Sequence, residues 1–178
     1  IGWAPNNASF QTMVTAMRVI WGEDRAREWL EGIQDNKPKD YRKNTRIVDA
    51  TARGEVDVGF VNHYYLNRFI QEDGEDFPAR NHFMAEGGPA NLVMVAGAGI
   101  LETSSNPENA QKLLRFMLSK VAQQYFAGQT FEYPLVDGVK TSRTLPPLSD
   151  LRNPSIDMVA LADLAGTQAL LRDLGIIP

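Results

Sequence analysis

The sequence contains no cysteine, and only two of its 178 residues are histidines. The absence of cysteine excludes thiol catalysis, iron–sulfur clusters and cysteine-bound zinc. We also find no Ser–His–Asp order, no paired-carboxylate motif, no Walker loop and no His-x-x-x-His pair. An enzymatic function therefore has little support.

Long apolar runs and clusters of basic residues alternating with aromatics are missing as well. No apolar run approaches the roughly 20 residues that a membrane-spanning helix needs, and the opening residues do not form a signal peptide. We expect them instead to form a short strand inside a larger protein. The net charge of −4 argues against nucleic acid as the main partner. With 43% hydrophobic residues, the chain can bury a core as one domain or as parts of two.

A pair of adjacent tyrosines follows an apolar stretch in the first half of the chain. Residues 56–61 are typical of a buried strand, and ligands in open α/β sheets bind beyond the carboxyl ends of strands. Directly after this stretch come Asn62, His63, Tyr64 and Tyr65. Two phenols can provide oxygen ligands for a hard cation, but ionising each at neutral pH costs about 4 kcal/mol. A trivalent metal would offset that cost. The simpler interpretation is that one ring packs in the core and the other lies on the surface.

A helix start near the N-terminus is a second candidate site. Asn7 is a good N-cap, and apolar residues recur at helical spacing over residues 10–21. The free backbone N–H groups, the positive end of the helix dipole and the side chains of Asn7 and Ser9 suit a small oxyanion. The simpler interpretation is an ordinary capped helix. The same two interpretations apply to Asn44, which is expected to cap another short helix.

Helical and strand-like segments alternate along the chain, which predicts an α/β fold. Further helices are expected over residues 23–35, 44–52, 66–72, 106–117, 119–128 and 155–174. Besides the opening residues and residues 56–61, short strands are expected over residues 81–84 and 91–96.

Taken together, these stretches resemble the ferric-ion-binding proteins of bacterial ABC importers, periplasmic binding proteins with a transferrin-like iron site. The most specific element is the Asn-x-Tyr-Tyr sequence ending at Tyr65, which follows a Gly-Glu-x-Asp sequence starting at Gly54. The resemblance runs in order along nearly the whole chain. Its motifs are Pro5-Asn6-Asn7-Ala8-Ser9-Phe10, Lys43-Asn44-Thr45, Gly54-Glu55-Val56-Asp57, Asn62-His63-Tyr64-Tyr65, Asn106-Pro107-Glu108-Asn109-Ala110 and Glu132-Tyr133-Pro134-Leu135.

The resemblance implies a type II, transferrin-like periplasmic-binding-protein fold, with the C-terminal lobe and a returning segment of the other lobe in this chain. Residues 1–94 would form the C-terminal lobe with the anion and tyrosine site. Residues 95–140 would belong to the N-terminal lobe, and residues 141–178 would return to the C-terminal lobe. Under that division, the helical region over residues 106–128 is expected to expose apolar surface.

The same resemblance implies an Fe(III) site and no catalysis. Tyr64 and Tyr65 would bind the metal as phenolates, and Fe(III) is a hard ion that prefers such charged oxygen donors. Phosphate or carbonate would complete the coordination as a synergistic anion. The expected anion-binding residues are Asn7, Ala8, Ser9, Asn44 and Asn62.

Partners and location follow from the same resemblance. The family implies an ABC-transporter permease as partner and a periplasmic location, or a lipoprotein on the cell surface. The remaining iron ligands, usually a histidine and an acidic or tyrosine side chain, would come from a missing N-terminal lobe or another chain. By motif, His63 and His82 do not replace them.

Two departures from the family pattern leave the choice of anion open. Asn7 and Ala8 stand where family members commonly have Ser and Gly, and Phe10 stands where a subgroup has a further tyrosine. The alternative is a binding protein of the same fold for an organic or phosphorylated solute. A phosphonate, thiamine or a sugar phosphate would then bind without metal, and the tyrosines would stack on it or hydrogen-bond to it.

Overall fold

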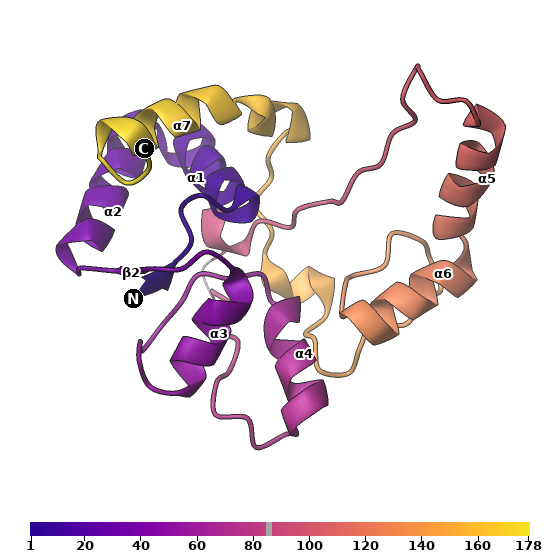
Figure 1. The fold of residues 1–178 in the computed structure, drawn as a ribbon, viewed down its shortest axis with the longest axis horizontal. Helices are drawn as coiled ribbons and strands as arrows, with labels where there is room; N and C mark the ends of the chain where they lie inside the picture. The colour runs from indigo at the N-terminus through magenta and orange to yellow at the C-terminus, as the bar shows by residue number, and fades with distance from the viewer. Residues whose placement is uncertain (85–86) are drawn as a thin grey trace. The chain divides into compact units, whose positions relative to one another are not determined.

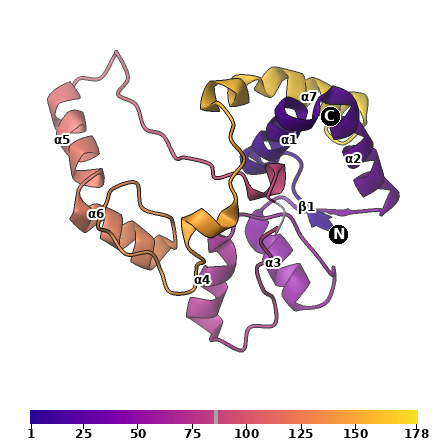
Figure 2. The same ribbon diagram turned by 180° about the vertical axis from the view of Figure 1, so that it is seen from behind.

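The computed structural model describes residues 1–84 and 87–178, and the chain divides into two compact units. The first unit combines Ile1–Leu92 with Leu151–Pro178, and the second is Val93–Asp150. Figures 1 and 2 show the ribbon from opposite sides. The assignment of chain segments to two lobes of a larger protein stays a prediction.

Three parallel segments form the small sheet of the first unit. Strand β1 (Gly2–Trp3) pairs with β2 (Lys39–Asp40), and Gly2 also forms a parallel bridge to Gly59. The N–H and the carbonyl of Gly2 hydrogen-bond to the residues on either side of Gly59, at 2.8 and 3.1 Å. Since its two edges are both used, β1 is the central segment.

The stretch over residues 56–61 is not the buried strand that its composition predicts. Only Gly59 takes part in a bridge, and Val58 is 55% exposed. In the described part of the chain, no further segment pairs beside this stretch. The stretch therefore pairs with β1 at one residue only and forms an isolated bridge.

The strands expected over residues 81–84 and 91–96 are also wrong for the described residues, which adopt no strand there. The side chain of Asn91 takes the place of a strand partner. Its amide oxygen accepts from the N–H of Met84 at 3.0 Å, and its amide nitrogen donates to the carbonyls of Met84 and Leu151, both at 2.6 Å. One buried side chain thus satisfies backbone groups that a sheet would otherwise pair.

Helices α1 (Ala8–Trp21), α2 (Glu23–Asp35) and α7 (Leu164–Asp173) enclose the main core of the first unit (Figure 1). Trp3 packs edge-on against Phe10, with ring centroids 5.6 Å apart, so the core also holds β1. Apolar burial of this kind is the main driving force for folding. The buried core residues are Trp3, Phe10, Val14, Met17, Ala26, Leu30, Leu170, Leu171, Ile176 and Ile177.

Helices α3 (Asn44–Ala52) and α4 (Tyr64–Asp73) pack together over a second, smaller cluster (Figure 2). Its buried members are Val48, Leu66 and Ala79. Helix α4 begins at Tyr64, two residues before the expected start. The tyrosine pair therefore belongs to a regular element that is anchored by its own apolar contacts.

The C-terminal helix is shorter than the one expected over residues 155–174. A 3₁₀ helix, η4 (Met158–Ala162), precedes α7, and Asp163 separates the two. The carboxylate of Asp163 accepts from the N–H of Gly166 at 3.0 Å and so caps α7, while Asp157 caps η4 in the same way. Aspartate competes well for exposed N–H groups at helix starts, which explains why the helical pattern restarts here.

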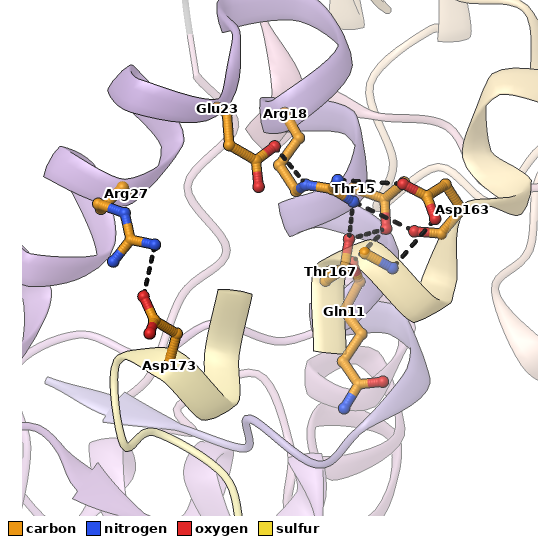
Figure 3. A network of polar contacts seen from close by, with 9 residues as sticks. Gln11, Thr15, Arg18, Glu23, Arg27, Asp163, Thr167 and Asp173 are labelled. Carbon is orange, nitrogen blue, oxygen red and sulfur yellow. Dashed lines mark hydrogen bonds and ion pairs between the residues drawn. The ribbon is translucent and has the colours of Figure 1, made fainter. Parts of the chain in front are cut away.

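A largely buried arginine joins α1 to the C-terminal segment, as Figure 3 shows. The side chain of Arg18 is 14% exposed and forms ion pairs with Glu23 at 2.7 Å and Asp163 at 3.0 Å. It also donates to the hydroxyl of Thr167 at 3.0 Å, and that hydroxyl lies 2.7 Å from the hydroxyl of Thr15. Polar contacts therefore reinforce the apolar packing between the two ends of the chain.

The second unit contains α5 (Pro107–Met117), α6 (Lys120–Tyr125) and the π-helical turn η2 (Phe126–Thr130). Apolar side chains on its helices are exposed, Val121 by 74%, which confirms the expected exposure of apolar surface in this region. Its exposed large apolar side chains include Leu101, Leu113, Phe116, Leu118, Val121, Tyr125 and Leu135.

Two further 3₁₀ turns, η1 (Pro89–Asn91) and η3 (Leu148–Leu151), complete the secondary structure of the described residues. None of the helices within residues 1–84 and 87–178 is both long enough and apolar enough to cross a membrane.

Candidate functional site

Three polar turns lie at the carboxyl ends of the three parallel segments in the first unit. The turn at residues 5–9 follows β1, the turn at residues 41–44 follows β2, and residues 60–65 follow the Gly59 bridge. Because parallel segments end at the same edge of a sheet, all three turns belong to one edge. The sequence-predicted tyrosine and anion residues are distributed over these turns.

The tyrosine pair occupies the first turn of α4. The ring centroids of Tyr64 and Tyr65 lie 4.6 Å apart, with 40° between the ring planes, and both residues are half-buried. The amide of Asn62 donates to the phenol oxygen of Tyr64 at 3.2 Å. The N-terminus of a helix carries partial positive charge, which favours negative groups such as phenolates. The pair therefore occupies the positive end of the α4 dipole.

The two rings differ in their contacts with the interior. Tyr65 packs against the apolar cluster of Val48, Leu66 and Ala79. Tyr64 instead contacts the ring of His63 edge-on, with centroids 5.6 Å apart. The two rings are nonetheless neighbours. The simpler interpretation predicted instead that one ring would lie in the core and the other on the surface. Metal binding by the pair stays a prediction.

An exposed arginine lies over both tyrosine rings. The guanidinium carbon of Arg68 lies 5.3 Å from the ring centroid of Tyr64 and 5.6 Å from that of Tyr65. Distances below about 6 Å are typical of cation–π attraction. Sequence reasoning missed this residue, although its spacing of four and three positions from the tyrosines places all three on one helix face.

The turn before α1 combines a cap with a free amide. Asn7 is the N-cap, and its side-chain oxygen accepts from the N–H of Ser9 at 2.9 Å and from the hydroxyl of Ser9 at 2.6 Å. The N–H of Asn7 donates to the carbonyl of Ala4 at 2.9 Å. The N–H of Ala8, by contrast, has no hydrogen-bond acceptor among the residues that the structure describes. The capped-helix interpretation thus holds for Asn7 and Ser9, and the amide of Ala8 remains open to a ligand.

A hollow of about 480 Å³ lies beside this free amide. One wall is the turn from Pro5 to Ala8, and the other is formed by Asp40, Tyr41 and Arg42. The sequence did not predict this second wall, because the two exposed residues of β2 give no apolar signal for a strand. Tyr64, Tyr65, Asn44 and Asn62 are not among the residues that line this hollow.

Tyr41 lines the hollow but differs chemically from the tyrosine pair. Its hydroxyl donates to a carboxylate oxygen of Glu55 at 2.7 Å. Burial, together with this hydrogen bond and the charge of Glu55, raises the pKa of Tyr41 to about 12. Tyr41 is thus held as a neutral phenol at physiological pH and is a poor candidate for a metal-binding phenolate.

Asn44 is largely buried and does not cap its helix. The residue before it, Lys43, occupies the N-cap position of α3 and makes no side-chain capping bond, so the capping interpretation of Asn44 is wrong. Asn44 is 4% exposed, and its side chain has no hydrogen-bond partner among the described residues. Among the described residues, every side-chain polar atom that is fully enclosed has a hydrogen-bond partner. The amide of Asn44 has none, so it is not fully enclosed and reaches the surface. A ligand can meet it there and satisfy it.

The acidic and histidine residues do not form a metal site by themselves. Within residues 1–84 and 87–178, no three His, Asp or Glu side chains are close enough to hold a metal ion. His63 lies beside Tyr64, and His82 is exposed. A metal bound by this part of the chain would therefore depend on other oxygen donors, such as the phenols.

Residues 2–159 match the family of bacterial extracellular solute-binding proteins. The chain belongs to this family. The chain is 32% identical over 177 residues to the major ferric iron-binding protein of Neisseria meningitidis serogroup B. That alignment covers 98% of the chain and 53% of the relative. The Fe(3+)-binding periplasmic protein of Serratia marcescens is 29% identical over 163 residues, which cover 89% of the chain and 48% of that protein.

The solved structure of iron-bound HitA from Pseudomonas aeruginosa has the same fold as this chain. The TM-score is 0.91 at 32% sequence identity, with 98% of this chain and 56% of HitA covered. The expected α/β fold of the periplasmic-binding-protein type is thereby confirmed for a partial lobe. The chain spans about half the length of the curated relatives that it matches.

Proposed function

We propose that this chain provides one side of an Fe(III) site in the solute-binding component of a bacterial ABC importer. Tyr64 and Tyr65 bind the metal as phenolates, and a synergistic anion binds at the turn before α1. The observation that carries the proposal is the meeting of three polar turns at one edge of the sheet, with paired tyrosines in one and a free amide in another. The relatives named for ferric iron support it.

The chemistry of Fe(III) fits these side chains. The ion is hard and strongly charged, so it offsets the cost of ionising two phenols and prefers their oxygens to softer donors. The helix N-terminus beneath Tyr64 and Tyr65 favours the same negative charge. The amide of Asn62, already 3.2 Å from the Tyr64 oxygen, can donate to a phenolate as well as to a phenol.

The anion, phosphate or carbonate, has several donors at the other turns. The free N–H of Ala8 and the helix dipole of α1 are the first, with the side chains of Asn7 and Ser9 beside them. The unpartnered amide of Asn44 is a further donor. Arg42 adds a positive charge to the hollow next to Ala8.

The remaining parts of the proposal concern the protein beyond this chain. The other iron ligands come from a missing N-terminal lobe or another chain, and the same structure covers the exposed apolar surface of α5 and α6. Residues 1–94 and 141–178 form the C-terminal lobe, and residues 95–140 belong to the other lobe. The loaded protein docks on a permease, from the periplasm or as a lipoprotein on the cell surface, and catalyses no reaction.

A visible absorption titration tests the proposal. The complete gene product that contains this chain is titrated with ferric citrate, with and without phosphate or bicarbonate. We expect a tyrosinate-to-iron charge-transfer band that grows with metal and requires one of the two anions. Absence of the band in the complete gene product would discard iron as the ligand.

The size of the hollow beside α1 favours a second candidate function. At about 480 Å³ it lies within the range of about 300–1,000 Å³ that is typical of pockets for small organic ligands. A phosphonate, thiamine or a sugar phosphate would place its anionic or polar group at Ala8 and Arg42 and would need no metal. Tight calorimetric binding of such a compound to metal-free protein, without a ferric band, would favour this function.

A further inference from the structure

Arg68 lies beside the tyrosine pair and forms no ion pair with the described residues. Its guanidinium lies over the rings of both Tyr64 and Tyr65, and none of the ion pairs among the described residues includes it. The side chain is exposed, so water could solvate it fully in another rotamer. Its place over two rings at once therefore reflects attraction to their faces.

The spacing along α4 explains why one arginine reaches both rings. Arg68 lies four residues after Tyr64 and three after Tyr65, and side chains three and four apart are neighbours on a helix. A side chain that contacts two adjacent rings limits the rotation of each. The two rings consequently share one side of the helix, 4.6 Å apart.

We propose that Arg68 is a positioning residue that holds the Tyr64 and Tyr65 rings side by side before the metal arrives. This proposal rests on the Fe(III) site proposed above. Its functional benefit is that preorganised ligands lose less conformational entropy when they bind the metal. The positive charge of Arg68 also partly offsets the mutual repulsion of two phenolates on neighbouring residues. Removal of residues that orient metal ligands typically weakens metal binding by about 10- to 100-fold.

The first experiment measures the ring positions without metal. The complete gene product is labelled selectively on its tyrosine rings, and Tyr64→Phe and Tyr65→Phe variants assign the two signals. We expect a nuclear Overhauser effect between the two rings that Arg68→Met weakens or removes and Arg68→Lys partly retains. Unchanged ring signals and an unchanged effect in Arg68→Met would overturn the proposal.

Arg25→Met is a matched control for this measurement. Arg25 is an exposed arginine on α2 whose guanidinium lies 4.8 Å from the ring centroid of Trp21, so it makes the same type of surface contact elsewhere. We expect Arg25→Met to leave the tyrosine rings unaffected. Thermal unfolding of both variants separates a local change at the rings from general loss of structure.

The second experiment compares iron binding by the same variants. Competition with citrate should give a dissociation constant for Fe(III) about 10- to 100-fold higher in Arg68→Met than in the parent and unchanged in Arg25→Met. Equal constants in Arg68→Met and the parent would overturn the role of Arg68 in metal binding. A parent protein without any ferric band would refute the iron site itself, while the ring measurement would still decide whether Arg68 positions the pair.

Discussion

Tyr41 and the Tyr64–Tyr65 pair show how position gives one side-chain type two chemical roles. Tyr41 donates to Glu55, and burial with that carboxylate raises its pKa to about 12, so it stays a neutral hydrogen-bond donor. The pair instead lies at the N-terminal end of α4, beneath Arg68. Tyr41 is therefore held as a neutral phenol, and we propose the pair, not Tyr41, as the source of phenolate ligands.

Tyr65→Phe should abolish the tyrosinate-to-iron band in the complete gene product. The substitution removes one phenolate oxygen but keeps the ring that packs against Leu66 and its neighbours, so the fold should persist. Tyr125→Phe is the control, because Tyr125 is an exposed residue of α6 outside the proposed site. Visible titration with ferric citrate checks both variants, and an identical band in Tyr65→Phe would contradict the proposed ligand.

At the scale of elements, one helix cap and one close backbone contact help to place the polar turns. Asn7 caps α1 through its side-chain oxygen, whereas α3 and α4 begin without a side-chain cap from the described residues. The parallel bridge between Gly2 and Gly59 then brings the chain leading to the tyrosines beside β1. The site depends on that bridge more than on any long strand.

Gly59→Ala should lower the free energy of unfolding by about 1–3 kcal/mol, the usual cost of overpacking. A Cβ atom at this position would collide with Cγ2 of Ile47, in α3. Gly32→Ala is the control with the opposite expected sign. Gly32 lies inside α2, and a methyl group added there would meet no atom within 4 Å, so alanine should stabilise the helix by about 0.5–1 kcal/mol. Urea unfolding measures both, and equal stability of Gly59→Ala and the parent would contradict the close packing.

Arg18→Met should weaken the attachment of the C-terminal segment to α1 and lower the free energy of unfolding by about 1–3 kcal/mol. The side chain is 14% exposed and bonds to two carboxylates and the Thr167 hydroxyl (Figure 3). Arg27→Met is the comparison. Among the described residues, Arg27 forms a single ion pair, with Asp173, which is more exposed to solvent, so its loss should lower the free energy of unfolding by at most about 1 kcal/mol. Urea unfolding that ranks Arg27→Met as the more damaging change would refute this order.

At the scale of the whole molecule, the two units differ in how well they cover their apolar residues. The first unit has a continuous core from β1 to α7, whereas the second exposes Phe116, Val121 and Tyr125 along α5 and α6. Exposed apolar surface is typical of a face that another structure covers. The chain also spans about half the length of its curated relatives, which supports the proposal that the rest of the protein provides the cover.

The isolated 178-residue chain should bind a hydrophobic dye more strongly, mole for mole, than the complete gene product. The exposed side chains of α5 and α6 would be free in the first and covered in the second. A double substitution, Leu113→Glu with Val121→Glu, should reduce dye fluorescence of the isolated chain, because both residues are exposed there. Equal dye binding by the two forms of the protein would contradict the proposed cover.

The sequence by itself determined most of the helices, the tyrosine pair and the family resemblance, because these depend on neighbours along the chain. Apolar spacing and the Asn7 cap define α1, and the Asn-x-Tyr-Tyr order can be recognised without any tertiary contact. Only the tertiary structure decided which stretches pair, because a strand exists only with a partner. Within the described part of the chain, residues 56–61 form a single bridge, and the side chain of Asn91 bonds to backbone groups where a strand was expected. It also decided that Arg18 meets Asp163, 145 residues away, since packing of the folded core brings them together.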